Sequence, residues 1–322
     1  MEQRKLIKFG ASSHVLSIPT HWMKKNHLKK GDTIFLEENS EGNIVLSTQF
    51  KEIEQISSYT IEADNKTVNR IEREIFSAYT NNYNLIKIKG SNLRNIVKNI
   101  RRSLHSFVAL EIIEEDDTKI IAKDFLNLKD VSINENIRRI DIILRGMMQD
   151  MVKCVYGDFS ASVYERDYDI NRFCFLILRA INGATENPNI IRVLNIKNED
   201  LIPTWLLCLH LEDIGDEIKR VSRFLKSHEL DDKIKKELSS SLMTIEKSYL
   251  DAMKSYYTQN YELAFNVDLN KDDIINDLNK LFEKYPVTGV ARITERLKKM
   301  SSAIGYIAQI VYGAGVKRKV KS

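Results

Sequence analysis

The chain has 322 residues, a formal net charge of +4 and an apolar fraction of 43%, which together predict a globular protein of two or three domains. It has no run of about 18 apolar residues and no apolar signal core near its start, so neither membrane insertion nor secretion is expected. The three cysteines match no metal-binding spacing, and we expect buried free thiols in a reducing, cytoplasmic compartment. They are Cys154, Cys174 and Cys208.

Basic residues concentrate near the N-terminus, at 24–30, at 87–102 and at 317–321, whereas carboxylates recur after Glu165. A basic N-terminal part and a C-terminal part with recurring carboxylates favour two different ligands. The alternative reading of each charge cluster is a solvated face. For the last of them, 317–321, the default expectation is a disordered, solubilising tail.

Residues 1–52 predict short β elements. Apolar residues at 6–9 indicate a strand, 10–14 a loop, and the alternation at 15–18 a second strand that ends at Pro19. Thr20 is expected to cap a short helix over 21–26.

A hairpin of 33–37 with 43–47 follows this helix. These strands bury too little apolar surface to be stable alone, and pairing with a second copy is the simplest remedy.

Residues 57–128 predict a small α+β domain with the order β-α-β-α-β-β, its sheet covered on one side. The expected elements are 59–62, 66–79, 85–88, 93–104, 109–114 and 118–122.

Residues 131–314 predict an all-α domain, because apolar residues recur at three and four positions. Short connections between its segments imply antiparallel neighbours, and a repeat of three segments predicts a pair of three-helix bundles. The expected helices are 133–156, 160–183, 202–228, 230–258, 261–284 and 288–312, followed by a basic tail at 315–322.

The N-terminal sequence carries a specific pattern over about 45 residues. Its parts are Arg4-Lys5, Gly10-Ala11-Ser12-Ser13, Leu16-Ser17-Ile18-Pro19, Trp22 and Leu28-Lys29-Lys30-Gly31-Asp32. This pattern resembles the SpoVT/AbrB swapped-hairpin family, and more closely the N-terminus of archaeal PhoU-like proteins. One departure is Ala11, where relatives often carry a second glycine.

The resemblance implies an obligate dimer of interleaved hairpins that grips double-stranded DNA with basic loop residues. By position the DNA-binding residues would be Arg4, Lys5, Lys8, Ser12, Ser13 and His14. The residue types agree, since Lys and Arg neutralise phosphates while hydroxyls and loop amides add hydrogen bonds. The alternative is a dimerisation module that does not bind DNA.

Two carboxylate pairs stand at helical spacing, Glu165 with Asp169 and Glu212 with Asp216. Residues four apart share a helix face, and like charges there repel. A cation between two such pairs on adjacent helices would relieve the repulsion, and oxygen ligands suit Mg²⁺, Ca²⁺, Mn²⁺ or iron. We therefore expect a divalent metal or iron site here, with an acidic solvated groove as the alternative.

These carboxylate pairs resemble the E/D-x-x-x-D motifs of PhoU, and the sequence at 166–179 resembles the archaeal branch of that family. The resemblance spans most of residues 131–312. That resemblance implies a pair of three-helix bundles, a metal or metal-cluster site in each, and a role in phosphate signalling. The second bundle departs from the pattern, because Glu295 is followed by Lys299. One metal site at most is expected, in the first bundle.

No nucleotide-binding, dinucleotide-binding or serine-hydrolase motif occurs, and the histidines lack zinc-site spacing. No enzymatic reaction is therefore predicted, and a metal-dependent hydrolase would need a base that nothing specifies. The sequence predicts a homodimeric, DNA-binding transcriptional regulator of phosphate uptake with a helical sensor domain. The alternative is an adaptor that acts on the ATPase of a phosphate ABC transporter or on a signalling protein.

Overall fold

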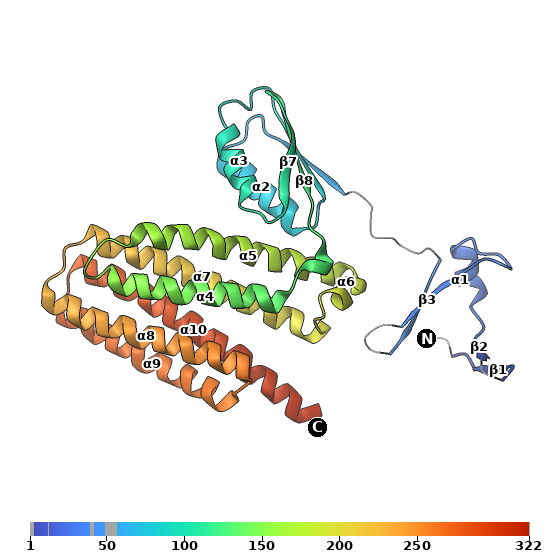
Figure 1. Cartoon of the computed structure of the whole chain (residues 1–322). Coiled ribbons are helices and arrows are strands. Elements are labelled where there is room, and N and C mark those ends of the chain that lie inside the picture. Colours follow the sequence, from blue (N-terminus) through green and yellow to red (C-terminus); the bar gives the residue numbers. More distant parts are fainter. Residues whose placement is uncertain (1–2, 12, 39–41, 49–56, 322) are drawn as a thin grey trace. The chain divides into compact units, whose positions relative to one another are not determined.

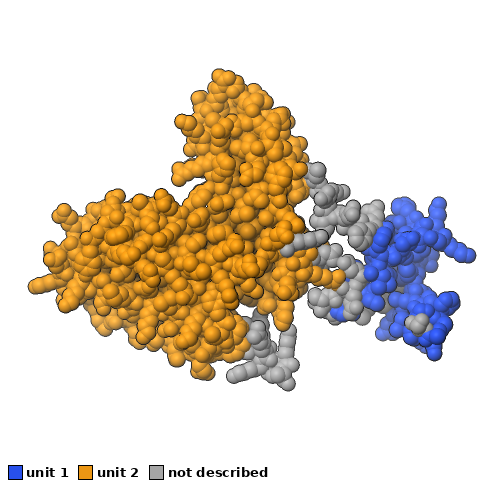
Figure 2. Space-filling model, in the orientation of Figure 1, with its two compact units in different colours: residues 1–55 blue, residues 56–322 orange. Residues whose placement is uncertain are grey.

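The computed structural model describes residues 3–11, 13–38, 42–48 and 57–321. The chain divides into two compact units, Met1–Gln55 (unit 1) and Ile56–Ser322 (unit 2), coloured separately in Figure 2. Each unit has its own arrangement of elements, and in unit 2 the α/β part is followed by a helical part (Figure 1).

Unit 1 consists of two separate antiparallel hairpins and one short helix. Its elements are β1 (Ile7–Phe9), β2 (Ser13–Val15), α1 (Thr20–Lys25), β3 (Phe35–Glu38) and β4 (Ile44–Ser47). The pairing of β3 with β4 confirms the expected second hairpin.

The first hairpin is tighter than predicted. Gly10 takes a φ of +73°, a left-handed conformation that glycine adopts without penalty, so the chain reverses directly after Phe9. Ser13 therefore pairs with Phe9, and both Ser13 and His14 lie in β2 rather than in a loop. Thr20 is the first helical residue rather than the cap, a position that Pro19 takes without a side-chain hydrogen bond.

The α/β part of unit 2 holds a four-stranded sheet in the order β5-β6-β8-β7, with β5 parallel to β6 and the other pairs antiparallel. Alternate residues such as Ile86, Ile88 and Ile120 are fully buried in a core shared with the two helices. The elements are β5 (Ser58–Glu62), α2 (Val68–Thr80), β6 (Leu85–Lys89), α3 (Val97–His105), β7 (Leu110–Glu115) and β8 (Lys119–Asp124). The predicted β-α-β-α-β-β order is confirmed.

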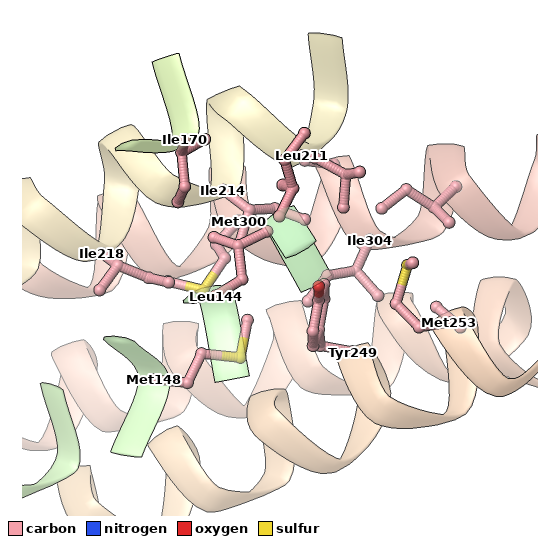
Figure 3. Close-up of a cluster of buried hydrophobic side chains, with 14 of the residues drawn as sticks. Leu144, Met148, Ile170, Leu211, Ile214, Ile218, Tyr249, Met253, Met300 and Ile304 are labelled. Atoms are coloured by element: carbon pink, nitrogen blue, oxygen red, sulfur yellow. The ribbon is translucent and has the colours of Figure 1, made fainter. Parts of the chain in front are cut away.

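The helical part contains α4 (Ile133–Lys153), α5 (Ser160–Glu186), α6 (Pro188–Val193), α7 (Leu201–Ser227), α8 (Asp232–Thr258), α9 (Tyr261–Lys284) and α10 (Thr288–Lys321). Helices α4, α5 and α7 pack together, as do α8, α9 and α10, and α10 also packs along α7. Both groups share one continuous hydrophobic core, in which Met148, Ile214, Met253 and Ile304 meet (Figure 3). None of the described helices is long and apolar enough to cross a membrane.

A buried polar contact also joins the two helix groups. Tyr249 on α8 is fully buried and donates a hydrogen bond of 2.9 Å to Oδ1 of Asp141 on α4. Tyr257 donates to the other carboxylate oxygen at 3.1 Å, and Arg145 bonds to both oxygens. Asp141 is therefore fully hydrogen-bonded although it is buried.

Most helix boundaries lie within three residues of the prediction, but one helix was not predicted and another is much longer than predicted. The connection between the predicted helices 160–183 and 202–228 includes the short helix α6, Pro188–Val193, with proline at its first position, where its missing N–H costs nothing. Helix α10 continues to Lys321, so residues 315–321 of the predicted tail belong to it.

Candidate nucleic-acid interface and acidic groove

The first hairpin of unit 1 has two chemically different faces. In the β1–β2 register Lys8 lies opposite His14, whereas Ile7 lies opposite Val15. Because side chains alternate along a strand, Lys8 and His14 share one face, and Ile7, Phe9 and Val15 share the other. One face is basic and the other is apolar.

The described residues predicted to bind DNA are all exposed. They are Arg4, Lys5, Lys8, Ser13 and His14. The Ser13 hydroxyl donates to the backbone oxygen of Phe9 across the turn, so it also holds the hairpin together. Ser12, the remaining predicted residue, lies outside the described residues.

The apolar face of the hairpin is equally exposed. Ile7 is 61% and Phe9 68% exposed, and in the second hairpin Leu36 is 66% exposed. Among the described residues of unit 1 whose burial is assigned, none is buried. Hairpins with so much uncovered apolar surface are only marginally stable by themselves.

In unit 2 two carboxylates, Asp167 and Asp216, lie at the contact between α5 and α7. The Lys219 ammonium lies 2.6 Å from Oδ2 of Asp167 on α5 and 2.6 Å from Oδ1 of Asp216 on α7. Arg220 adds a further bond of 2.6 Å to Oδ2 of Asp216. The cations at this helix contact are thus side chains of α7 itself.

The α5 residues that face α7 are not those the sequence pattern singled out. Glu165 and Asp169 are exposed, whereas Asp167 is buried. Two residues correspond to about 200° around a helix, so Asp167 lies on the opposite side of α5 from Glu165 and Asp169. Ile170 packs against Gly215 of α7, which places the contact face of α5 on Asp167 and Ile170.

Glu212 is the most perturbed carboxyl in this groove. Its pKa is raised to about 7, first by burial and then by the negative charges of Asp216, Asp213 and Asp167, against the opposing effect of Lys219. Burial likewise raises the pKa of Asp167, although the hydrogen bond from Lys219 opposes this. At neutral pH the groove therefore carries less negative charge than its count of carboxylates indicates.

Within the described part of the chain, no three acidic, histidine or cysteine side chains gather closely enough to hold a metal ion. In the second helix group Asp268 accepts hydrogen bonds from Lys271, Gln309 and Tyr312 instead. Glu295 and Lys299 on α10 are both exposed.

Sequence reasoning missed Asp167 and Lys219, which are central to the groove. The available signal was the pair Lys219-Arg220, which stands three and four residues after Asp216 and so on the same helix face. Such a pair supplies cations to Asp216 without a metal. The three cysteines are buried and free, as expected, and the Cys174 thiol donates to the backbone oxygen of Cys208 at 3.6 Å.

No protein-family model matches the chain. No curated protein matches its sequence either. Part of the chain is similar to a solved structure, that of PhoU from Pseudomonas aeruginosa, with 17% sequence identity and a TM-score of 0.44. The similarity covers 56% of this chain and 93% of the PhoU chain.

Proposed function

We propose that this protein is a dimeric, DNA-binding transcriptional regulator of phosphate uptake, in which unit 1 binds DNA and the helical part of unit 2 is the sensor. The observation that carries the proposal is the two-faced first hairpin, with Lys8 and His14 on one face and exposed apolar residues on the other.

The apolar face accounts for the dimer. Ile7, Phe9 and Leu36 lie in two separate hairpins, and neither hairpin covers the apolar side chains of the other. A second copy of unit 1 offers the same surfaces in the same order, so a symmetric pair can bury them. The SpoVT/AbrB-like sequence pattern of residues 4–32 supports this arrangement.

The basic face of the first hairpin accounts for the proposed binding of DNA. Arg4, Lys5 and Lys8 stand close together in sequence and are exposed, and a dimer doubles this set of cations. Neutralising phosphates releases counterions, which gives sequence-independent affinity that falls steeply with salt. The exposed imidazole of His14, on the same face as Lys8, adds a hydrogen-bonding group beside them.

The link to phosphate rests on the PhoU-like sequence motifs of the helical part. The proposed mechanism is a coupling free energy, in which a partner or a metal ion that binds the helical part alters the DNA affinity of the dimeric unit 1. The α5–α7 groove, with Glu212 and the Asp167–Lys219–Asp216 bridge, is the proposed sensing site.

The test is fluorescence anisotropy with DNA from upstream of the protein's own gene and of neighbouring phosphate-transporter genes, across a salt series. The variant carries Arg4→Gln, Lys5→Gln and Lys8→Gln in the full chain. A matched control neutralises three exposed lysines of α8, Lys233, Lys236 and Lys254. We expect the first variant to lose affinity and to show a smaller salt slope, and the control to bind like the wild type.

Binding no tighter than to random DNA at low salt would reject the DNA-binding proposal. The adaptor alternative would then stand, with unit 1 serving only to dimerise the chain. That alternative predicts co-purification with the ATPase of the phosphate transporter, unchanged in the triple-glutamine variant.

A further inference from the structure

A polar cavity of about 470 Å³ opens where the α/β part of unit 2 meets the end of α5. Its wall includes Tyr59 from β5, Asn81 and Tyr83 from the turn after α2, and Glu186 from the last residue of α5. None of these residues belongs to the α5–α7 groove or to unit 1.

The turn that shapes the cavity is held in an unusual conformation. Asn82 has a φ of +61°, which non-glycine residues seldom adopt, and its side-chain amide donates 3.2 Å to the backbone oxygen of Arg179. Gly183 on α5 makes room for it, because a β-carbon there would lie 3.2 Å from the Asn82 amide nitrogen. The turn is therefore fixed against α5, and the cavity beside it is pre-formed.

Four side chains of the wall keep an oxygen without a hydrogen-bond partner among the described residues. The Asn81 amide group donates 2.8 Å to Ser77, which leaves its oxygen free. The hydroxyls of Tyr59 and Tyr83 and the carboxylate of Glu186 make no hydrogen bond or ion pair within the described structure.

The side chains that line the cavity carry a net negative charge. Glu186 is the only charged residue among those lining it. The C-terminal ends of α2 and α5 both reach the cavity, and neither helix has a basic residue in its last turn. The carbonyl groups at the α2 end are already hydrogen-bonded, for example that of Tyr79 to Arg179, so the negative charge at the cavity comes chiefly from Glu186 and the end of α5, and it favours a cation over an anion.

The shape and the aromatic wall favour an organic cation over a metal ion. The rings of Tyr59 and Tyr83 lie 5.2 Å apart at 48°, and an ammonium group near such rings is attracted to their faces. The cavity is also much larger than a metal ion, which needs several ligands in a close shell.

We propose that this cavity binds a small primary amine. Its ammonium group donates hydrogen bonds to the Glu186 carboxylate and the Asn81 oxygen, and its alkyl chain lies along the rings of Tyr59 and Tyr83. A primary ammonium has three donors for these acceptors, whereas a quaternary ammonium has none. The site lies at the start of β5, directly after the segment that joins units 1 and 2, and is independent of the proposed DNA binding.

The experiment is isothermal titration of the full chain, without DNA, with 1,4-diaminobutane at low ionic strength. Two comparison compounds separate charge from shape, namely the neutral 1,4-butanediol and the donor-free tetramethylammonium ion. We expect saturable binding of the diamine, one per chain, and no saturable binding of the diol. Tetramethylammonium should bind more weakly than the diamine.

Glu186→Gln removes the charge and keeps the size, and it should weaken diamine binding by at least about tenfold. The matched control is Glu283→Gln, the same change at an exposed position of α9, which should leave the affinity unchanged. Tyr83→Phe tests the hydroxyl contact independently and should also weaken binding. An equal diamine affinity in the wild type and Glu186→Gln, or no binding at millimolar diamine, would overturn the proposal whatever the result with DNA.

Discussion

Arg179 on α5 and Asp124 at the end of β8 form a buried ion pair, with Nη2 2.5 Å from Oδ2 and each side chain only 3% exposed. The other terminal nitrogen of Arg179 donates to the backbone oxygen of Tyr79, and the guanidinium lies 4.6 Å from the centre of the Tyr79 ring. One arginine thus fastens the helical part to both a strand and a helix of the α/β part.

Arg179→Met should destabilise unit 2 by about 3–5 kcal/mol, because it leaves the Asp124 carboxylate buried without its cation. Adding Asp124→Asn should recover part of that loss, since the amide oxygen still accepts from the Leu126 N–H. Urea unfolding of both variants gives the two free energies of unfolding. Arg94→Met, which breaks the exposed pair with Asp117, is the control and should change stability little. A double variant no more stable than the single one would contradict the role of the unpaired charge.

Lys219→Ala should increase the affinity of the α5–α7 groove for Mn²⁺ by at least about tenfold, because it removes the ammonium that bridges Asp167 and Asp216. Electron paramagnetic resonance of free Mn²⁺ measures the bound fraction directly. Adding Asp216→Asn to this variant should abolish the gain. If wild type and Lys219→Ala bind Mn²⁺ equally, the ammonium does not occupy the position of a metal.

Glu212→Gln should change the pH dependence of stability in a defined direction. The pKa of Glu212 is raised from 4.5 to about 7, chiefly by burial. Between these values the folded state keeps a proton that the unfolded state has lost, so wild-type stability falls as pH rises from about 4.5 to about 7. Relative to wild type, the glutamine variant should therefore gain about 1–3 kcal/mol between pH 5 and pH 8.

Denaturant unfolding at both pH values measures that gain for Glu212→Gln. The exposed Glu165→Gln on α5 reports what the same substitution does at the surface. A difference between Glu212→Gln and wild type that is the same at pH 5 and pH 8 would show that Glu212 does not titrate in this window.

Ile7→Asp should dissociate the proposed dimer, because it places a charge on the apolar face of the first hairpin. Light scattering after size-exclusion chromatography gives the mass of the particle. Lys8→Gln, on the opposite face of the same strand, should leave the mass unchanged while it weakens DNA binding. A dimer that persists in Ile7→Asp would place the dimer contact outside this hairpin.

The long helices were predictable from sequence because each has a wide apolar stripe and a clear start or stop. The segment expected at 261–284 is α9, Tyr261–Lys284, capped by the Asn260 side chain. In α10 the predicted end at 312 is wrong, because Gly313 directly follows it but does not take the left-handed φ of a helix-terminating glycine, and the helix continues to Lys321.

The face of α5 that contacts α7 was harder to predict from the sequence. Its carboxylates occupy positions 165, 167 and 169, so periodicity alone offers two competing faces, and only packing against Gly215 and Lys219 selects Asp167. The turn at Gly10 was misjudged for a similar reason, because a single φ of +73° shortens the loop that the residue types indicate.

Because its core is continuous, the helical part should not fold as two separate fragments. Tyr249 of α8 bonds to Asp141 of α4, and α10 lies along α7, so a cut between Ser227 and Asp232 would separate side chains that bury one another. Each fragment alone should aggregate, whereas the two expressed together should reassemble. Complementation of split fragments would thus report, inside a cell, how strongly one half of the helical part requires the other.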